Sequence, residues 1–215
     1  METKDKFVIT INRQFGTGGR FIGEQLAKRL NVKFVDKEIL NSAAKLLEID
    51  KSVAEKLSNK KPSWWDDFIN FCSTTTNNIS IEDKYDQIEP TTRQLFYAQA
   101  KIIKEIAEME SCVIIGRCAF DILKDMPNTL KIFIHSSDDI RVKRIVEVNN
   151  VTEEKAKKTI KEIDSIRESY TKAYTNKFWW DARNYDFTLD ISKMGIDKTV
   201  DKIIEMAPHF IHIEG

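Results

Sequence analysis

The sequence predicts an α/β fold in which helices cover both faces of a mostly parallel sheet of five strands. Short β-rich apolar runs alternate along the chain with longer stretches of helical periodicity, and this order builds such a sheet. The chain has 215 residues, the length of one α/β domain with an insertion, and 41% of them are hydrophobic. We therefore expect a single domain over residues 1–215.

The amino-terminal elements are predicted by three consecutive patterns. Residues 7–11 are apolar or β-branched and predict a buried strand. Asn31 is suited to end the helix that follows, and residues 32–35 predict a second, short strand. The inner face of that helix is predicted by apolar residues at helical spacing, namely Ile22, Leu26 and Leu30.

The middle of the chain departs from this alternation. Residues 37–58 have helical spacing, whereas residues 59–90 combine prolines and aromatic side chains with a polar tract. We interpret residues 41–95 as a helical insertion within the domain rather than as a second domain.

The carboxyl-terminal half resumes the alternation. Two basic helices are predicted over residues 138–149 and 152–174, and Thr152 is a suitable N-cap for the second. A final helix is predicted over residues 197–206. The remaining strands are expected at residues 112–116, 130–134 and 187–191, after a long helix with Ile102, Ile103 and Ile106 on its apolar face.

Ligands of open parallel sheets bind beyond the carboxyl ends of the strands. In this sequence, many residues at those positions are charged or are glycines, and we therefore expect a binding site at this edge of the sheet. The residues concerned are 12–20, Asp36 and Lys37, Arg117, Ser136 and Ser137, and Ser192.

The strongest local signal is the glycine-rich segment of residues 13–20, between the first strand and the first helix. Glycines let backbone amides approach phosphate oxygens, and the helix that follows adds its N-terminal amides and its dipole. A tight turn without a ligand is the alternative interpretation. The residues expected to hold the phosphates of a nucleotide are Arg13, Gly16, Thr17, Gly18, Gly19 and Arg20.

Five segments in order along the chain resemble the cytidylate kinase-like family of P-loop proteins. The glycine-rich segment and the pair formed by Asp164 and Arg167 show a more distant similarity to bacterial cytidylate kinases. The resemblance implies a nucleoside monophosphate kinase fold with a lid at residues 141–180. It also implies ATP and Mg²⁺ as cofactors, and CMP or dCMP as the acceptor of the γ-phosphate. The five segments are residues 9–23, 34–40, 113–119, 174–181 and 185–187.

The glycine-rich segment departs from the usual Walker A motif, G-x-x-x-x-G-K-[ST]. Arg13 stands at the first glycine, Gly19 at the lysine and Arg20 at the hydroxyl residue. A guanidinium can bind phosphate oxygens, so Arg20 is predicted to supply the missing positive charge. Because Arg20 is no metal ligand, Mg²⁺ is expected to be held mainly through ATP and water, with no metal site on the protein.

Transfer of a phosphoryl group depends on positioning and on charge neutralisation, so arginines are the expected catalytic residues. Arg141 and Arg144 lie three residues apart on one predicted helix and Arg167 lies on the next. Arg20, Arg141, Arg144 and Arg167 are the predicted catalytic residues. The resemblance places the last three in the lid. A solvated basic helix face with ion pairs is the alternative.

The resemblance also implies that Asp36, Arg117 and Asp164 orient the acceptor. Asp36 follows the second strand and could equally be the N-cap of a helix that begins near Lys37. Arg117 stands at the mouth of a central strand, where a structural ion pair is the alternative. Trp179 and Trp180 could stack on a base, but packing is the favoured interpretation.

Composition narrows the class of partner. The chain has 34 basic and 34 acidic residues, whereas proteins that bind long nucleic acid usually carry a positive excess. No apolar run approaches the length of a membrane span, and the three cysteines show no metal-ligand spacing. We expect a cytoplasmic protein that binds small nucleotides, and the aromatic segment at residues 62–71 makes a homodimer plausible.

Two alternative functions remain open from the sequence. The missing lysine and hydroxyl favour a nucleotide- or phosphate-binding regulatory protein that is catalytically weak or inactive. A kinase that acts on another small metabolite would have the same fold and a different acceptor pocket.

Overall fold

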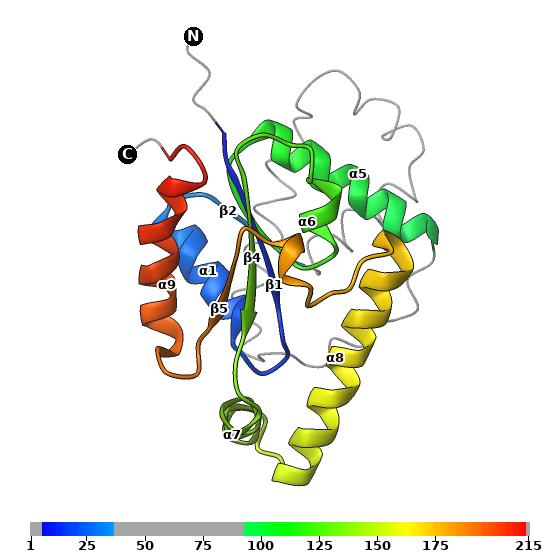
Figure 1. Cartoon of the computed structure of the whole chain (residues 1–215), viewed down its shortest axis with the longest axis vertical. Helices are drawn as coiled ribbons and strands as arrows, with labels where there is room; N and C mark the ends of the chain where they lie inside the picture. The colour runs from blue at the N-terminus through cyan, green and yellow to red at the C-terminus, as the bar shows by residue number, and fades with distance from the viewer. Residues whose placement is uncertain (1–5, 37–92, 214–215) are drawn as a thin grey trace.

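The computed structural model describes residues 6–36 and 93–213 (Figure 1). Its five strands form one sheet in the order β2-β3-β1-β4-β5, and every neighbouring pair is parallel. The predicted five-stranded α/β sheet is therefore confirmed. The strands are β1 (Val8–Arg13), β2 (Lys33–Val35), β3 (Cys112–Ile115), β4 (Thr129–His135) and β5 (Phe187–Asp190).

Strand β1 lies at the centre of the sheet and explains why both faces are apolar. Val8 is level with Cys112 of β3 and with Thr129 of β4, so β1 has a partner on each side. Its side chains alternate between the two faces, and each face packs under helices. Val8 belongs to one buried cluster, whereas Ile9 and Ile11 belong to the other.

Helices α1 (Gly19–Arg29) and α9 (Gly195–Met206) cover one face of the sheet, and Figure 1 shows them side by side. Helices α5 (Arg93–Met109) and α6 (Ala119–Ile122) lie on the other face. Asn31 follows α1 with a φ of 52°, which is the left-handed conformation of a helix end. Buried side chains on the first face include Ile22 and Leu26 of α1 with Val200 and Ile203 of α9.

Helices α7 (Asp138–Asn149) and α8 (Glu153–Thr175) extend beyond the carboxyl ends of the strands, in the lower part of Figure 1. Thr152 caps α8, because its side chain accepts a hydrogen bond from the backbone N–H of Lys155. The two helices share a buried apolar cluster with Phe15, which comes from the glycine-rich segment. Two 3-10 helices, η1 (Ala182–Asn184) and η2 (Ala207–His209), complete the described elements.

Most of the predicted insertion at residues 41–95 lies outside the described residues, and only residues 93–95, which begin α5, are within them. The predicted helix over residues 37–58 and the aromatic segment at residues 62–71 also lie outside. Of the helices that the structure describes, none has both the length and the apolar character of a membrane span.

Candidate functional site

The glycine-rich segment, called here the glycine loop (residues 13–20), turns the chain from β1 into α1 in a conformation that requires glycine at two positions. Gly16 and Gly18 have φ values of 82° and 72°, in the left-handed region that side chains with a Cβ disfavour. The Gln14 amide donates to the Ile134 carbonyl of β4 at 3.0 Å. Helix α1 follows Gly18 directly, so its N-terminal amides and positive dipole end face the loop.

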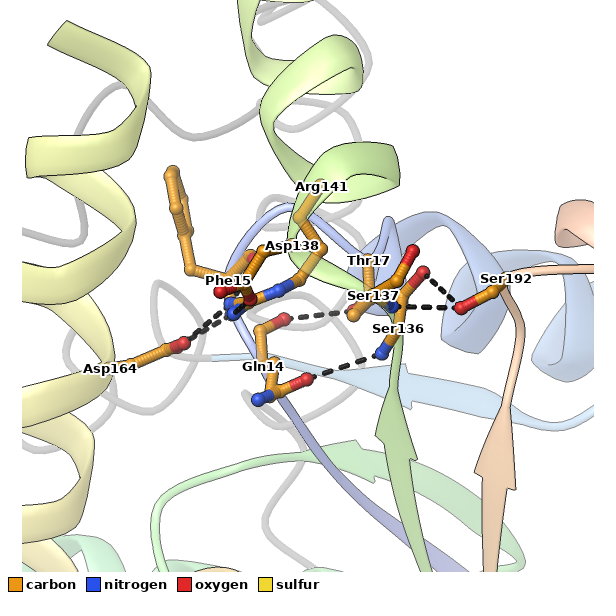
Figure 2. Close-up of polar contacts among 9 residues, drawn as sticks. All are labelled: Gln14, Phe15, Thr17, Ser136, Ser137, Asp138, Arg141, Asp164 and Ser192. Carbon is orange, nitrogen blue, oxygen red and sulfur yellow. Dashed lines mark hydrogen bonds and ion pairs between the residues drawn. The ribbon is translucent and has the colours of Figure 1, made fainter. Parts of the chain in front are cut away.

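The first half of the loop is tied to the α7–α8 pair by a polar cluster (Figure 2). The Phe15 amide donates to Oδ1 of Asp164 at 2.7 Å. Nη1 of Arg141 donates to the other oxygen of Asp164 at 2.6 Å and to the Phe15 carbonyl at 3.2 Å. Arg141 is 5% exposed and also contacts Asp138, so its charge is engaged with two carboxylates.

Arg167 of α8 holds the same half of the loop from a second direction. Its Nη1 donates to the Arg13 carbonyl at 3.0 Å, and its guanidinium lies 5.6 Å from the centre of the Phe15 ring. Burial raises the pKa of the nearby Asp164 carboxyl, while the Phe15 amide and the arginines Arg167 and Arg141 oppose that rise. We call Arg141, Asp164 and Arg167 the clamp.

In the second half of the loop, neighbouring side chains crowd Gly18 and Gly19. A Cβ on Gly18 would lie 2.8 Å from Cδ1 of Ile196 and 2.9 Å from Cζ of Arg144. Arg144 therefore reaches the loop from α7, and its predicted catalytic role stays a prediction. A Cβ on Gly19 would lie 2.6 Å from Cγ of Arg13, which places the Arg13 side chain across the start of α1.

Arg20 and Asp36 were expected on opposite sides of the reaction, but the structure brings them together. Nη2 of Arg20 lies 2.9 Å from Oδ2 of Asp36, and Nε lies 3.7 Å from Glu24 one turn along α1. Asp36 is only 4% exposed. A buried carboxylate needs a counter-charge, and Arg20 provides one. The predicted roles of both residues in ligand binding stay predictions.

A pocket opens at the carboxyl ends of β1 and β3, beside the glycine loop. Its cavity volume is about 50 Å³, or about 480 Å³ when the open space at its mouth is included. Among the described residues that line it, three are arginines and none is a carboxylate, so its lining is cationic. The lining residues are Asn12, Arg13, Ile115, Gly116, Arg117, Cys118, Arg167, Tyr170, Thr171 and Trp179.

The conformation of the chain after β3 places Arg117 at this pocket. Gly116, Arg117 and Cys118 have φ values of 72°, 51° and 57°, so three consecutive residues are left-handed. The guanidinium of Arg117 lies 5.4 Å from the centre of the Tyr170 ring. Left-handed backbone is unfavourable for side chains with a Cβ, so this turn is a strained segment of the chain, and the predicted role of Arg117 stays a prediction.

Neutral hydrogen-bonding groups complete the pocket wall. Asn12 donates through Nδ2 to the Tyr185 hydroxyl at 2.9 Å, and that hydroxyl donates to the Trp179 carbonyl. Burial raises the pKa of Tyr170 to about 12 and that of the Cys118 thiol to about 12, so both stay protonated at neutral pH. The positive charges of the pocket are therefore not offset by a tyrosinate or a thiolate.

Sequence reasoning did not select Tyr170 and Thr171, which line the pocket together with Arg167. These residues lie three and four positions after Arg167 on α8, so they share its helix face. That spacing was the available signal, and it was missed because tyrosine and threonine are common on solvated helices. Trp179 is 5% exposed whereas Trp180 is 63% exposed, so only Trp179 contributes to the wall.

Mg²⁺ is bound in proteins by oxygen ligands such as carboxylates. Within residues 6–36 and 93–213, no group of three or more His, Cys, Asp or Glu side chains could hold a metal ion. Arg20 stands where the Walker hydroxyl would be, and its guanidinium faces Asp36. The described side chains therefore do not form a metal-binding cage of their own.

Comparison with solved structures gives one match that supports the fold, and two weaker ones. An uncharacterized protein from Eubacterium ventriosum is 28% identical, with a TM-score of 0.69 over 94% of this chain and 99% of that one. A shikimate kinase from Bacteroides thetaiotaomicron is 14% identical, with a TM-score of 0.48 over 94% of this chain and 98% of that one. A gluconokinase from Sinorhizobium meliloti is 12% identical, with a TM-score of 0.48 over 96% and 97%.

Comparison with sequence families is more specific, although among curated proteins none matches this chain. The model of the cytidylate kinase-like family matches residues 8–193. The match runs from the first residue of β1, through the glycine loop, the Arg117 turn and the clamp, to just beyond β5. This chain therefore belongs to the cytidylate kinase-like family.

Proposed function

We propose that this protein is an ATP-dependent kinase that transfers the γ-phosphate to a nucleoside monophosphate, with CMP or dCMP as the acceptor that the family implies. The observation that carries the proposal is the pocket with arginines 13, 117 and 167 in its wall, directly beside the glycine loop. A loop suited to donor phosphates and a cationic pocket suited to an acceptor phosphate are thus adjacent.

The residues divide into two groups by position. The glycine loop and the first turn of α1 hold the donor phosphates, and Arg144 reaches this end of the site beside Gly18. Arg117 and Arg167 hold the acceptor phosphate, because both line the pocket. Arg141 and Asp164 set the position of the loop through Phe15 rather than contact the substrate. The described side chains form no metal-binding cage, so Mg²⁺ would be held mainly through ATP and water.

The first experiment measures ADP production from Mg-ATP with CMP, dCMP, UMP, AMP or no acceptor. The wild-type chain should turn over with one pyrimidine monophosphate and remain near background without an acceptor. Arg117→Gln should raise the KM for that acceptor at least tenfold, because one charged contact to phosphate is lost. Lys143→Gln is the matched control, since Lys143 lies on the exposed side of α7 and outside the pocket.

A second candidate function is favoured by one specific observation. Two of the four arginines predicted to act on the transferring phosphoryl group, Arg20 and Arg141, are paired with the carboxylates of Asp36 and Asp164. An arginine that is held by a carboxylate is less able to neutralise a phosphoryl group, and this fits a nucleotide-binding protein that lacks transfer activity. Thermal stabilisation by ATP without turnover for any acceptor would support this candidate and contradict the kinase proposal.

A further inference from the structure

Gly19 lacks a side chain for a steric reason rather than a conformational one. It is the first residue of α1 and, unlike Gly16 and Gly18, its φ is not in the left-handed region. A Cβ added there would meet Cγ of Arg13 at 2.6 Å and Cβ of Arg13 at 2.9 Å. The room that the Cβ of a Walker lysine at this position would need is therefore filled by the side chain of Arg13.

The remainder of the Arg13 side chain extends from the glycine loop to the end of β3. A Cβ on Gly116 would lie 2.6 Å from Nη1 of Arg13, so the guanidinium lies against that residue. Arg13 and Gly116 both line the pocket. The Arg13 carbonyl accepts a hydrogen bond from Arg167 at 3.0 Å, which fixes the backbone from which the side chain departs.

Arg20 has a different environment from Arg13. Its guanidinium is 2.9 Å from the buried carboxylate of Asp36, which follows the edge strand β2. Arg20 is not among the described residues that line the pocket. Of the two arginines in the glycine loop, Arg13 is therefore the one whose guanidinium lies between the loop and the pocket.

We propose that Arg13 takes the place of the Walker lysine, an inference that rests on the proposed kinase function. During transfer, the bond from the γ-phosphorus to the bridging oxygen breaks and its electron pair stays on ADP. A phosphate oxygen of the acceptor supplies the pair for the new bond. Arg13 neutralises the charge on the moving phosphoryl group, and no proton is transferred at this residue.

A double-mutant cycle on thermal stability tests whether Arg13 fills the space beside Gly19, without any assay of activity. In the wild-type background, Gly19→Ala should lower the Tm, because the new Cβ overlaps Arg13. In the Arg13→Gly background, the same substitution should raise the Tm, since alanine favours helix over glycine. A Gly19→Ala effect of the same sign and size in both backgrounds would show that Arg13 does not fill this space.

Measurements of kcat test the role of Arg13 in phosphoryl transfer. Arg13→Gln should lower kcat about 100- to 1,000-fold, the range for removal of one charge-stabilising donor. Arg20→Gln should lower it at least tenfold less, and Lys143→Gln is the control at an exposed position. The double substitution R13G/G19K should regain at least tenfold over R13G, because a lysine then occupies the vacated space. A larger loss for Arg20→Gln than for Arg13→Gln would overturn the assignment.

The outcomes separate this proposal from the kinase proposal. If the wild type turns over and Arg13→Gln is equally active, the kinase function stands and the role of Arg13 is wrong. If the wild type binds Mg-ATP without turnover, a tenfold weaker Kd for Arg13→Gln keeps Arg13 as a phosphate ligand and overturns the kinase function. A wild-type chain that neither binds nor turns over Mg-ATP overturns both.

Discussion

The sheet face beneath α1 and α9 and the clamp beneath the glycine loop are both buried, but they are stabilised differently. The first is built from aliphatic side chains such as Ile9, Ile132 and Ile203, each 0% exposed. The clamp is built from charged side chains, with Arg141 5% and Arg167 8% exposed. Burial of aliphatic groups is favourable without a specific partner, whereas a buried charge is stable only with its partner in place.

This difference shows that a buried arginine next to a binding loop has two possible roles. It can contact the ligand, or it can set the position of the loop that does. Arg141 donates to the Phe15 carbonyl and to Asp164, and Asp164 accepts from the Phe15 amide, so both groups act on the loop backbone. The aliphatic face gives stability alone, while the clamp links stability to the geometry of the site.

The largest effect is expected on the aliphatic face. Ile132→Ala should lower the free energy of unfolding by about 4 kcal/mol, because the buried site cannot collapse around the cavity. Urea denaturation followed by circular dichroism measures the change. Ile140→Ala makes the same change at a side chain that is 43% exposed and should cost less than about 1 kcal/mol. Equal losses at the two positions would contradict the assigned core.

The clamp should show a partner-dependent loss. Arg141→Met should lower the free energy of unfolding by about 3 kcal/mol, because Asp164 loses a buried counter-charge. The double substitution R141M/D164N should recover at least half of that loss, since asparagine is uncharged and its oxygen can still accept from the Phe15 amide. If the double substitution costs as much as Arg141→Met and Asp164→Asn together, Arg141 and Asp164 are not coupled.

A smaller effect is expected at the start of α8, the helix that carries Asp164 and Arg167. Thr152→Ala should cost about 1 kcal/mol, because its side chain accepts from the Lys155 amide. Thr159→Ala is the matched control. The Thr159 hydroxyl donates to the Lys155 carbonyl within the helix, an interaction that adds little. Thermal unfolding of both variants separates the loss of the cap from the general effect of replacing threonine by alanine in a helix.

The smallest effect is a dependence on pH that the aliphatic face should lack. Burial raises the pKa of Asp164, so the folded chain keeps this proton at pH values where the unfolded chain has released it. The contribution of Asp164 to stability therefore falls as pH rises from the ordinary Asp pKa through its raised folded value. Relative to Asp164→Asn, the wild type should become less stable across that window. A rise instead would mean that the arginines hold the carboxyl ionised.

The sequence predicted the sheet well because its signals are local. Apolar runs such as residues 7–11 and 130–134 correspond to β1 and β4, and Thr152 caps the helix that begins at Glu153. The glycine loop was equally visible, since the left-handed backbone of Gly16 and Gly18 requires that residue type. Periodicity and turn chemistry were sufficient for these elements.

The partners of the charged residues could not be predicted in the same way. Arg141 and Asp164 are separated by 23 positions and Arg20 and Asp36 by 16, and no periodic pattern joins them. A basic residue on a helix has the same local sequence signal whether it contacts a ligand, a carboxylate or water. Only the packing of α7 and α8 against the loop determines which contact is made.

Phe15 has one further consequence for the whole molecule. Its side chain is 1% exposed and packs among Val142, Ile145 and Ile163, so the tip of the glycine loop shares a buried apolar cluster with both helices. A nucleotide that binds only the loop must then slow amide hydrogen exchange along α8, including turns that it never touches. Binding at the loop is thus expected to affect α8 both through this aromatic ring and through the hydrogen bonds of the clamp.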